Sequence, residues 1–416
     1  MMQHQGMMPS LTRCTRRAVL RWALGAGLSS PVVAGLLAAC GSNATPTAST
    51  SSGGASTAAS PTPTTSRPTS VVTVTTNTAT APAASATAVG TASPVALNLP
   101  KVTPEKTKIT FAVGGQEQFI YLPLTLAKQL GYFQEQGIDV TIANFSGGSK
   151  AAEALVGGSA DFVMGFYDHT IQVQPKGQYL QSVCLIDQYP GIVLLVSQKA
   201  ADKIKTLDDL KGKTVGVTAP GSSTQFFLNF ILSQHNIPQD AVSVVAIGTG
   251  STAYAAIAEG KVDAGMTVDP AATQLVQDGK ATVLWDTRSQ KDTVAAFGGP
   301  YPAGCFYSKE DFIKNNPQTV QALVNAGLKT LAWIQSHSAA EIADKMPPDF
   351  YANNKQLYVS SLQNSLTLFS PNGLMPADGP ATVRKVLALS DASVKNAQID
   401  LNRTYTNQFV QAALGK

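Results

Sequence analysis

The chain has few cysteines and few histidines, and this scarcity limits the chemistry that it can perform. Only 4 of its 416 residues are cysteine and only 4 are histidine. No group of these residues has the spacing of a zinc or redox motif. The chain also lacks the G-x-S-x-G turn that presents a catalytic serine, and no other catalytic constellation is evident. We therefore expect no bound metal, no cofactor and no enzymatic activity.

Two of the cysteines, Cys184 and Cys305, lie in segments with the apolar pattern of strands. A buried free thiol behaves as a small hydrophobic side chain, and this is how we interpret both residues. A single disulfide between them is the alternative, because exported proteins often carry such bonds.

Acidic residues are absent from the first 100 positions, whereas four arginines lie between residues 13 and 21. Residues 22–39 are weakly apolar. A basic segment followed by an apolar segment is typical of a secretory signal. A transmembrane helix is the alternative, but it needs about 20 predominantly apolar residues, and Pro31 interrupts this segment. We expect residues 1–39 to be a signal peptide.

The signal ends at the sequence LAAC, Leu37 to Cys40, which resembles a bacterial lipoprotein box. The resemblance implies that Cys40 receives a lipid and becomes the first mature residue. The protein would then be exported and anchored to the cell membrane, facing the periplasm or the cell exterior. The pair Arg16–Arg17 also resembles a twin-arginine export signal, so this route and the general secretory route both stay open.

Residues 40–100 have the composition of a flexible stalk. Arg67 is the one charged residue among Thr, Ser, Ala, Pro and Gly. Such a segment buries too little apolar surface to offset the entropy lost on ordering. The stalk also explains the basic net charge, because five of the 30 basic residues and none of the 26 acidic residues precede residue 101. The rest of the chain is nearly neutral, which argues against nucleic acid as a partner.

From residue 107 onward, apolar segments of strand and helix type alternate. Residues 108–115, 139–145 and 160–166 have the pattern of strands, and helical patterns lie between them. Alternation of this kind predicts an α/β fold with a mostly parallel sheet. The pattern starts again near residue 206, which indicates a second α/β lobe. We expect two crossings between the lobes, a hinge, and a cleft that binds a small molecule.

Four segments in this order resemble the substrate-binding proteins of bacterial ABC importers that serve nitrate, sulfonates, taurine and thiamine pyrimidine precursors. They read YLPLTLAKQLGYFQEQGIDV, ALVGGSADF, LDDLKGKTVGVTAPGSS and AEGKVDAGMTVDPAA. The resemblance implies a two-lobed periplasmic-binding-protein fold of type II, with residues 105–196 plus 291–416 as lobe 1 and 197–290 as lobe 2. It also implies a monomer that captures a small-molecule ligand and delivers it to an ABC permease. A sensory receptor of the same fold is the alternative.

Loops that follow the strands should form the ligand site, because parallel α/β sheets bind ligands at the carboxyl ends of their strands. These loops are GGQEQF at 114–119, FSGGSK at 145–150, GFYDHT at 165–170 and APGSSTQ at 219–225, and Asp-Pro at 269–270 occupies the matching place in lobe 2. We expect ligand contacts from Gln116, Phe119, Gly148, Ser149, Tyr167, Asp168, His169, Ser222, Ser223, Thr224 and Asp269.

Each of these assignments has a purely structural alternative. Hydroxyls and amides at the start of a helix bind anions, but serine and threonine are also ordinary N-caps. Asp168 and Asp269 could equally cap the helices that follow them. Only three arginines follow position 100, and none lies in a predicted cleft loop. Either helix N-termini alone hold an anion, or the ligand is not a strong anion.

Overall fold

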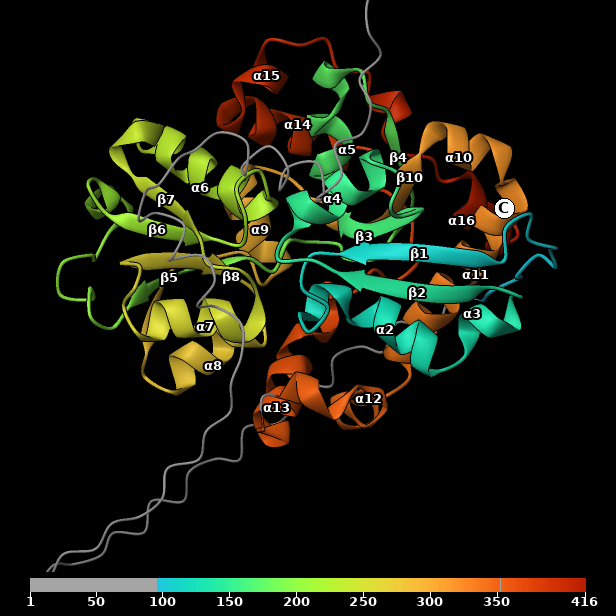
Figure 1. Cartoon of the computed structure of the whole chain (residues 1–416), viewed down its shortest axis with the longest axis horizontal. Helices are drawn as coiled ribbons and strands as arrows, with labels where there is room; N and C mark the ends of the chain where they lie inside the picture. The colour runs from blue at the N-terminus through green and yellow to red at the C-terminus, as the bar shows by residue number, and fades with distance from the viewer. Residues whose placement is uncertain (1–95, 352) are drawn as a thin grey trace, which may run out of the picture. The chain divides into compact units, whose positions relative to one another are not determined.

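A computed structural model describes residues 96–351 and 353–416 (Figure 1). The predicted signal peptide, Cys40 and most of the predicted stalk lie outside the described residues. Leu97 and Leu99 already pack against the hydrophobic core, and the Asn98 N–H donates to the Ala413 carbonyl at 2.8 Å. The folded part therefore begins a few residues before the expected start at 105.

The first sheet has five strands in the order β2-β1-β3-β10-β4. Strands β1 to β3 are parallel, whereas β10 is antiparallel to both β3 and β4. The strand bounds are β1 Lys108–Val113, β2 Asp139–Asn144, β3 Phe162–Phe166, β4 Leu180–Leu185 and β10 Gly304–Lys309. Every residue of β3 is buried, as expected for the central strand of a sheet covered on both faces.

The second sheet repeats this arrangement with the order β7-β6-β8-β5-β9. Its strands are β5 Val193–Ser197, β6 Thr214–Val217, β7 Ser243–Ala246, β8 Ala264–Thr267 and β9 Ala281–Asp286. Figure 1 shows the two sheets side by side, each flanked by helices. The predicted α/β class with two lobes is confirmed.

The α-helices flank these sheets. Those between the strands of the first sheet are α2 Leu122–Gln129, α3 Tyr132–Glu135, α4 Gly148–Val156 and α5 Asp168–Gln172. Those of the second lobe are α6 Ser223–Gln234, α7 Gly250–Ala258 and α8 Ala271–Gln277, and α9 Gln290–Phe297 follows them. After β10 come α10 Glu310–Asn315, α11 Pro317–Gln335, α12 Ala339–Lys345, α13 Lys355–Ser365, α14 Gly379–Ser390, α15 Ala392–Lys395 and α16 Gln408–Ala413.

Helix α14 connects the two halves of the molecule, because it packs against α6 as well as against α5 and α15. An aromatic cluster adds to this contact. The Phe227 ring of α6 lies 5.0 Å from the rings of both Phe297 and Tyr301, measured between centroids. The core of the first lobe thus continues into one face of the second, and a smaller separate core fills the other face.

The chain crosses between the sheets twice, after β4 and after β9, and the two crossing segments are hydrogen-bonded to each other. The Asp187 N–H donates to the Gly304 carbonyl at 2.9 Å, and the Ala303 N–H donates to the Asp187 carbonyl at 3.0 Å. Nearer the second sheet, the Gly191 N–H donates to the Thr287 carbonyl at 3.1 Å. The first crossing segment lies between residues 185 and 193. Strand β5, most of which we expected to lie at the end of lobe 1, therefore belongs to the second sheet.

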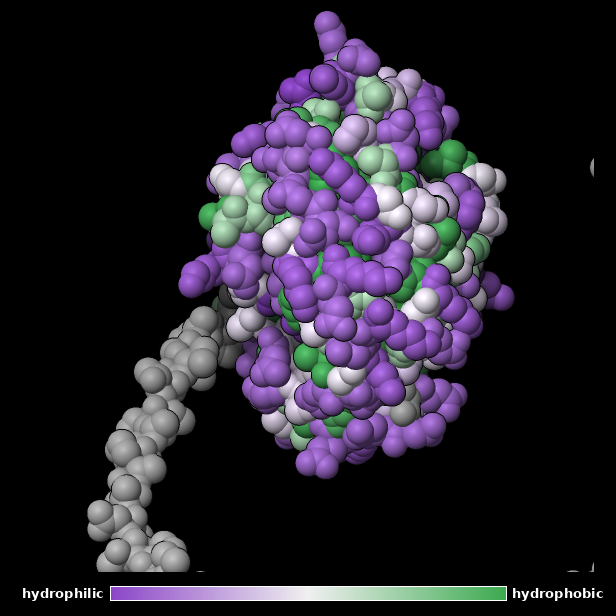
Figure 2. Space-filling view, turned by 90° about the vertical axis from the view of Figure 1, so that its left-hand side faces the viewer, coloured by the Kyte–Doolittle hydropathy of each residue, from purple (hydrophilic) through white to green (hydrophobic). Residues whose placement is uncertain are grey.

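The surface is mainly hydrophilic on the face shown in Figure 2, which looks onto the lobe of the second sheet, and hydrophobic residues are scattered over it. None of the helices within residues 96–351 and 353–416 has the length and apolar character of a membrane span.

The two strand cysteines are free and buried. In the register of β10 with β4, Cys305 pairs with Leu185 and Cys184 pairs with Phe306. Neighbouring residues of a strand point to opposite faces, so the two thiols lie on different sides of the sheet. Cys184 and Cys305 are therefore buried free thiols, as expected, and the alternative disulfide between them is not formed.

Neither thiol should react with a disulfide reagent at pH 8 while the protein is folded. Burial raises the pKa of Cys184 to about 12 and also raises the pKa of Cys305, so the reactive thiolate is scarce. Titration with Ellman's reagent should find two more thiols after unfolding in guanidinium than before it. Rapid modification of the folded protein at either position would contradict this packing.

Candidate functional site

A small pocket lies between the lobes, at the carboxyl ends of strands from both sheets. Its apolar walls include Tyr121 and Phe166 from the first lobe and Val268 from the second. Its polar lining includes Gln118, Gly148, Thr218, Ser222, Ser223 and Thr224. The pocket is therefore built from the end of β3, the loops that follow β1, β2, β6 and β8, and Ile192 of the first crossing segment.

Two helices begin at this pocket, one from each lobe. Helix α4 starts at Gly148 and α6 starts at Ser223, and neither N-cap residue makes a side-chain capping bond. The first turn of a helix has N–H groups without partners in the helix. The positive ends of both helix dipoles also lie there. The arrangement can bind a hydrogen-bond acceptor of a solute from both lobes at once.

Glycine lets the loops of the first lobe approach this position. A Cβ atom on Gly114 would lie 2.4 Å from the backbone carbon of Gly147. A Cβ atom on Gly147 would lie 2.8 Å from the Ala219 Cβ of the opposite lobe. Gly147 has a φ of 171°, an extended conformation open to any residue, so lack of space is what requires glycine here.

The lobes are joined across the cleft by hydrogen bonds of Ser149. Its N–H donates to the Ser222 Oγ at 3.0 Å, and its hydroxyl donates to the Pro220 carbonyl at 2.9 Å. The Ser222 hydroxyl in turn donates to the Ser149 Oγ at 3.2 Å. Ser222 is thus used for interlobe contact rather than for capping its own helix.

Asp168 forms a second link between the lobes. Its carboxylate accepts from the Ser223 hydroxyl at 2.9 Å and from the Tyr301 hydroxyl at 3.1 Å. Burial raises the pKa of Asp168, although neighbouring His169 and these hydrogen bonds partly oppose the shift. Tyr301 belongs to the second crossing segment, so this cluster joins both lobes and the hinge.

His169 is buried beside the start of α4. Among the described residues neither ring nitrogen has a hydrogen-bond partner. The Nε2 atom is 3.1 Å from the place where a Cβ atom of Gly148 would be. Burial lowers the pKa of His169, which favours the neutral imidazole. The ring also borders an open groove that Ser149 and Pro220 help to line on the outer side of the cleft.

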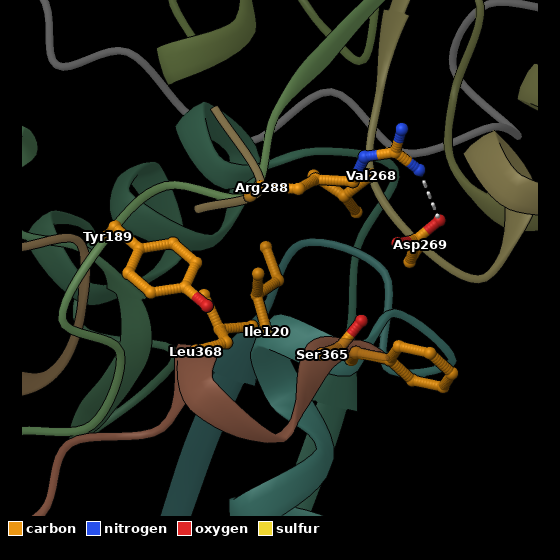
Figure 3. Close-up of a pocket in the computed structure, with 9 residues that line it drawn as sticks. Ile120, Tyr189, Val268, Asp269, Arg288, Ser365 and Leu368 are labelled. Atoms are coloured by element: carbon orange, nitrogen blue, oxygen red, sulfur yellow. Dashed lines mark ion pairs between the residues drawn. The ribbon is translucent and has the colours of Figure 1, made fainter. Parts of the chain in front are cut away.

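A second small pocket lies next to the cleft and the crossing segments (Figure 3). It is bordered by Phe119, Tyr189 and Asp269, and by Arg288 at one end. Arg288 forms an ion pair with Asp269 at 3.5 Å and another with Asp286 at 2.7 Å. The sequence predicted no arginine in a cleft loop. The one local feature that could have indicated a role for Arg288 is the acidic Asp286 two residues before it.

The structure brings most of the predicted ligand residues to the space between the lobes. Gly148, Ser222, Ser223 and Thr224 line the central pocket, Phe119 and Asp269 line the neighbouring pocket, and Ser149 and His169 line the groove. Asp168 lies behind Ser223. Asp269 also accepts from the Thr273 N–H at 2.9 Å, so it caps the first turn of α8.

Two predicted residues are used differently. The hydroxyl of Tyr167 is hydrogen-bonded to Thr404, so this side chain points into the first lobe. The Gln116 amide donates to the Thr125 hydroxyl at 3.1 Å. Gln118 and Thr218 also line the central pocket, but the sequence did not predict them as ligand residues.

Comparison with known proteins gives consistent results. A family model described as NMT1/THI5 like matches residues 118–340. A solved structure from Bordetella bronchiseptica RB50 is 41% identical, with a TM-score of 0.73, and the match covers 75% of this chain and 98% of that one.

More distant relatives differ in what their names describe. The alkanesulfonate-binding protein SsuA from Xanthomonas axonopodis pv. citri, solved with MOPS, is 21% identical with a TM-score of 0.59, covering 73% of this chain and 100% of that one. This likeness confirms the periplasmic-binding-protein fold. The 4-amino-5-hydroxymethyl-2-methylpyrimidine phosphate synthase THI5 of Saccharomyces cerevisiae is 25% identical over 240 residues, which are 55% of this chain and 67% of its own length.

Proposed function

Because the chain belongs to the NMT1/THI5-like family, we propose that it is the solute-binding component of an ABC importer. It captures a small molecule between its lobes and delivers it to a membrane permease. The observation that supports this most is the pocket at which two helix N-termini meet, one from each lobe and neither capped by the side chain of its own N-cap residue. A ligand held by both helices favours the closed arrangement over the open one.

The hinge makes this closure possible. Two crossing segments join the lobes, and hydrogen bonds of Ser149 with Ser222 and of Asp168 with Ser223 span the cleft, so opening the cleft would break them. A solute bound by α4 and α6 adds to these contacts. The permease then distinguishes the closed, loaded receptor from the open one.

The N-terminal sequence supplies the location in this proposal. Export by the signal and lipidation at Cys40 would hold the receptor at the outer face of the cell membrane, close to its permease. The stalk would let the monomeric binding unit reach that partner. These features belong to residues outside the described part of the chain, so they rest on the sequence alone.

We propose binding rather than catalysis, although the yeast relatives are named as synthases. A catalytic serine needs a hydrogen bond to a base that can take its proton. Here the Ser223 hydroxyl donates to Asp168, and within residues 96–351 and 353–416 no hydroxyl or thiol is hydrogen-bonded to His169. The hydroxyls of this cleft hold the lobes together.

The proposal is tested by thermal unfolding of protein that has been unfolded and refolded to remove any bound solute. The panel holds nitrate, bicarbonate, alkanesulfonates, taurine, aromatic sulfonates and thiamine-related pyrimidines. A ligand at about 100 times its dissociation constant should stabilise the protein by about 2.7 kcal/mol, a shift of a few degrees.

Ser222→Ala should then weaken binding by about tenfold, because the two interlobe hydrogen bonds of the Ser222 hydroxyl are lost. Ser233→Ala is the matched control, since Ser233 lies near the far end of the same helix and should leave the shift unchanged. If no compound stabilises the protein, and a small-molecule extract of cells does not either, the proposed function is wrong.

A further inference from the structure

The central pocket has no positive side chain to receive an anion. Among the described residues that line it, none is lysine, arginine or histidine. Arg288 is the one arginine that borders the neighbouring pocket. Its Nε donates to Asp286 at 3.0 Å, its Nη2 donates to the same carboxylate at 2.7 Å, and its Nη1 donates to Thr273 at 3.2 Å. The charge of Arg288 is therefore already balanced within lobe 2.

A carboxylate of the protein already faces the positive end of α6. Ser223 is the first residue of that helix, and its hydroxyl is 2.9 Å from Asp168, which is 0% exposed. The His169 Nδ1 is 4.0 Å from the Asp168 Oδ1. Burial lowers the pKa of His169, which disfavours a cation beside Asp168, and the hydroxyl donors Ser223 and Tyr301 oppose the rise that burial causes in the pKa of Asp168. An anion bound at this helix end would meet the carboxylate oxygens of Asp168.

The hydroxyl hydrogens of three serines around the pocket are also in use. Ser223 donates to Asp168, Ser222 donates to Ser149, and Ser149 donates to the Pro220 carbonyl. A hydroxyl has one hydrogen and two acceptor lone pairs. These three side chains can therefore accept hydrogen bonds from a solute, and backbone N–H groups of the two helix starts, other than that of Ser149, can donate to it.

From these contacts we propose that the solute is uncharged or cationic, and that Asp168 is the residue that excludes strong oxyanions such as nitrate and sulfonates. The solute would carry an acceptor for the helix N–H groups and N–H or O–H donors for the serine oxygens. The inference deepens the proposed function and rests on it, since it concerns the same pocket. It separates this chain from relatives whose names specify alkanesulfonates.

The first test compares Asp168→Asn with Asp161→Asn by isothermal titration with sodium nitrate and sodium methanesulfonate. Asp161 lies just before β3, at the end of that strand away from the cleft, whereas Asp168 lies just after the strand. The wild type and Asp161→Asn should bind neither salt measurably. Asp168→Asn should bind both at least about tenfold more tightly, the equivalent of one pKa unit of electrostatic interaction.

Unchanged anion affinity in Asp168→Asn would overturn the role of Asp168, and measurable binding of either salt in the cleft of the wild type would overturn the proposed charge class.

A second measurement needs no variant. Refolded wild-type protein is incubated with a cell extract filtered to small molecules and washed, and the solute released on unfolding is identified by mass spectrometry.

An uncharged or basic solute supports the inference, and a solute whose charge at neutral pH is purely negative overturns it while leaving the proposed function intact. If nothing is captured and no compound of the thermal panel binds, the proposed function itself fails, and this inference fails with it. The two failures are thus distinguished by the presence or absence of any bound solute.

Discussion

Gly147→Ala should leave both lobes folded and yet keep the cleft from closing. The added Cβ would lie 2.8 Å from the Ala219 Cβ and 3.1 Å from the Ser222 Oγ, both in the opposite lobe. Contacts below 3.0 Å force one side to move, and the simplest movement separates the lobes. Since the φ of Gly147 is 171°, alanine adds no backbone strain. Solute affinity should fall at least about tenfold, because the closed state then costs more than about 1.4 kcal/mol extra.

The distance between the lobes provides the measurement. Spin labels at Gln134 in α3 and Gln277 in α8 report it by pulsed electron paramagnetic resonance, since both residues are exposed and lie on different lobes. Gly147→Ala should shift the distance distribution away from that of the wild type. Adding Ala219→Gly removes the atom that clashes and should restore it. A wild-type distribution in the single variant, or failure of the second change to restore it, would contradict the proposed closure.

Asp187→Asn should stabilise the protein at neutral pH. Asp187 lies in the first crossing segment, is 0% exposed, and neither carboxylate oxygen has a hydrogen-bond partner among the described residues. Burial raises its pKa well above the usual 3.8. The folded state therefore holds a proton that the unfolded state releases. Stability of the wild type then falls as pH rises above about 4, by up to about 1.4 kcal/mol per pH unit, until the folded-state pKa is reached.

The asparagine side chain does not titrate, so the variant should not lose stability in this way as the pH rises. Its stability should equal that of the wild type near pH 4 and exceed it by a growing margin toward pH 8. Urea unfolding at several pH values measures the difference. Asp161→Asn is the control, because Asp161 accepts hydrogen bonds from Thr110 and Lys106 and has no comparable cost to relieve. A variant that is less stable than the wild type at pH 8 would show that a charged Asp187 is favoured in the fold.

The fold was predictable because its signals are local. The strand at Lys108–Val113, the glycine-rich loops after β1 and β2, and the restart of the pattern before β6 can each be read from short segments. The predicted resemblance to substrate-binding proteins is confirmed by the family match and by the two-lobed fold. The position of β5 was less accessible, since its apolar pattern suits either sheet.

The candidate site was only partly predictable, because hydrogen bonds between distant segments decide how each residue is used. Tyr167 and Asp168 are neighbours, yet Tyr167 points to Thr404 in the first lobe and Asp168 to Ser223 in the second. Arg288 became relevant only when folding placed it beside Asp269. Likewise, the packing of α14 on α6 joins segments too far apart for a local pattern to reveal.

The central claim is that a solute is held between the N-termini of α4 and α6. A crystal structure of the protein with the solute captured from the extract tests it most directly. We expect the solute in the pocket lined by Gly148, Ser223 and Thr224, with an acceptor atom within hydrogen-bond distance of first-turn N–H groups from both helices. A solute bound outside this pocket, or held by one lobe with the cleft closed over empty space, would contradict the account.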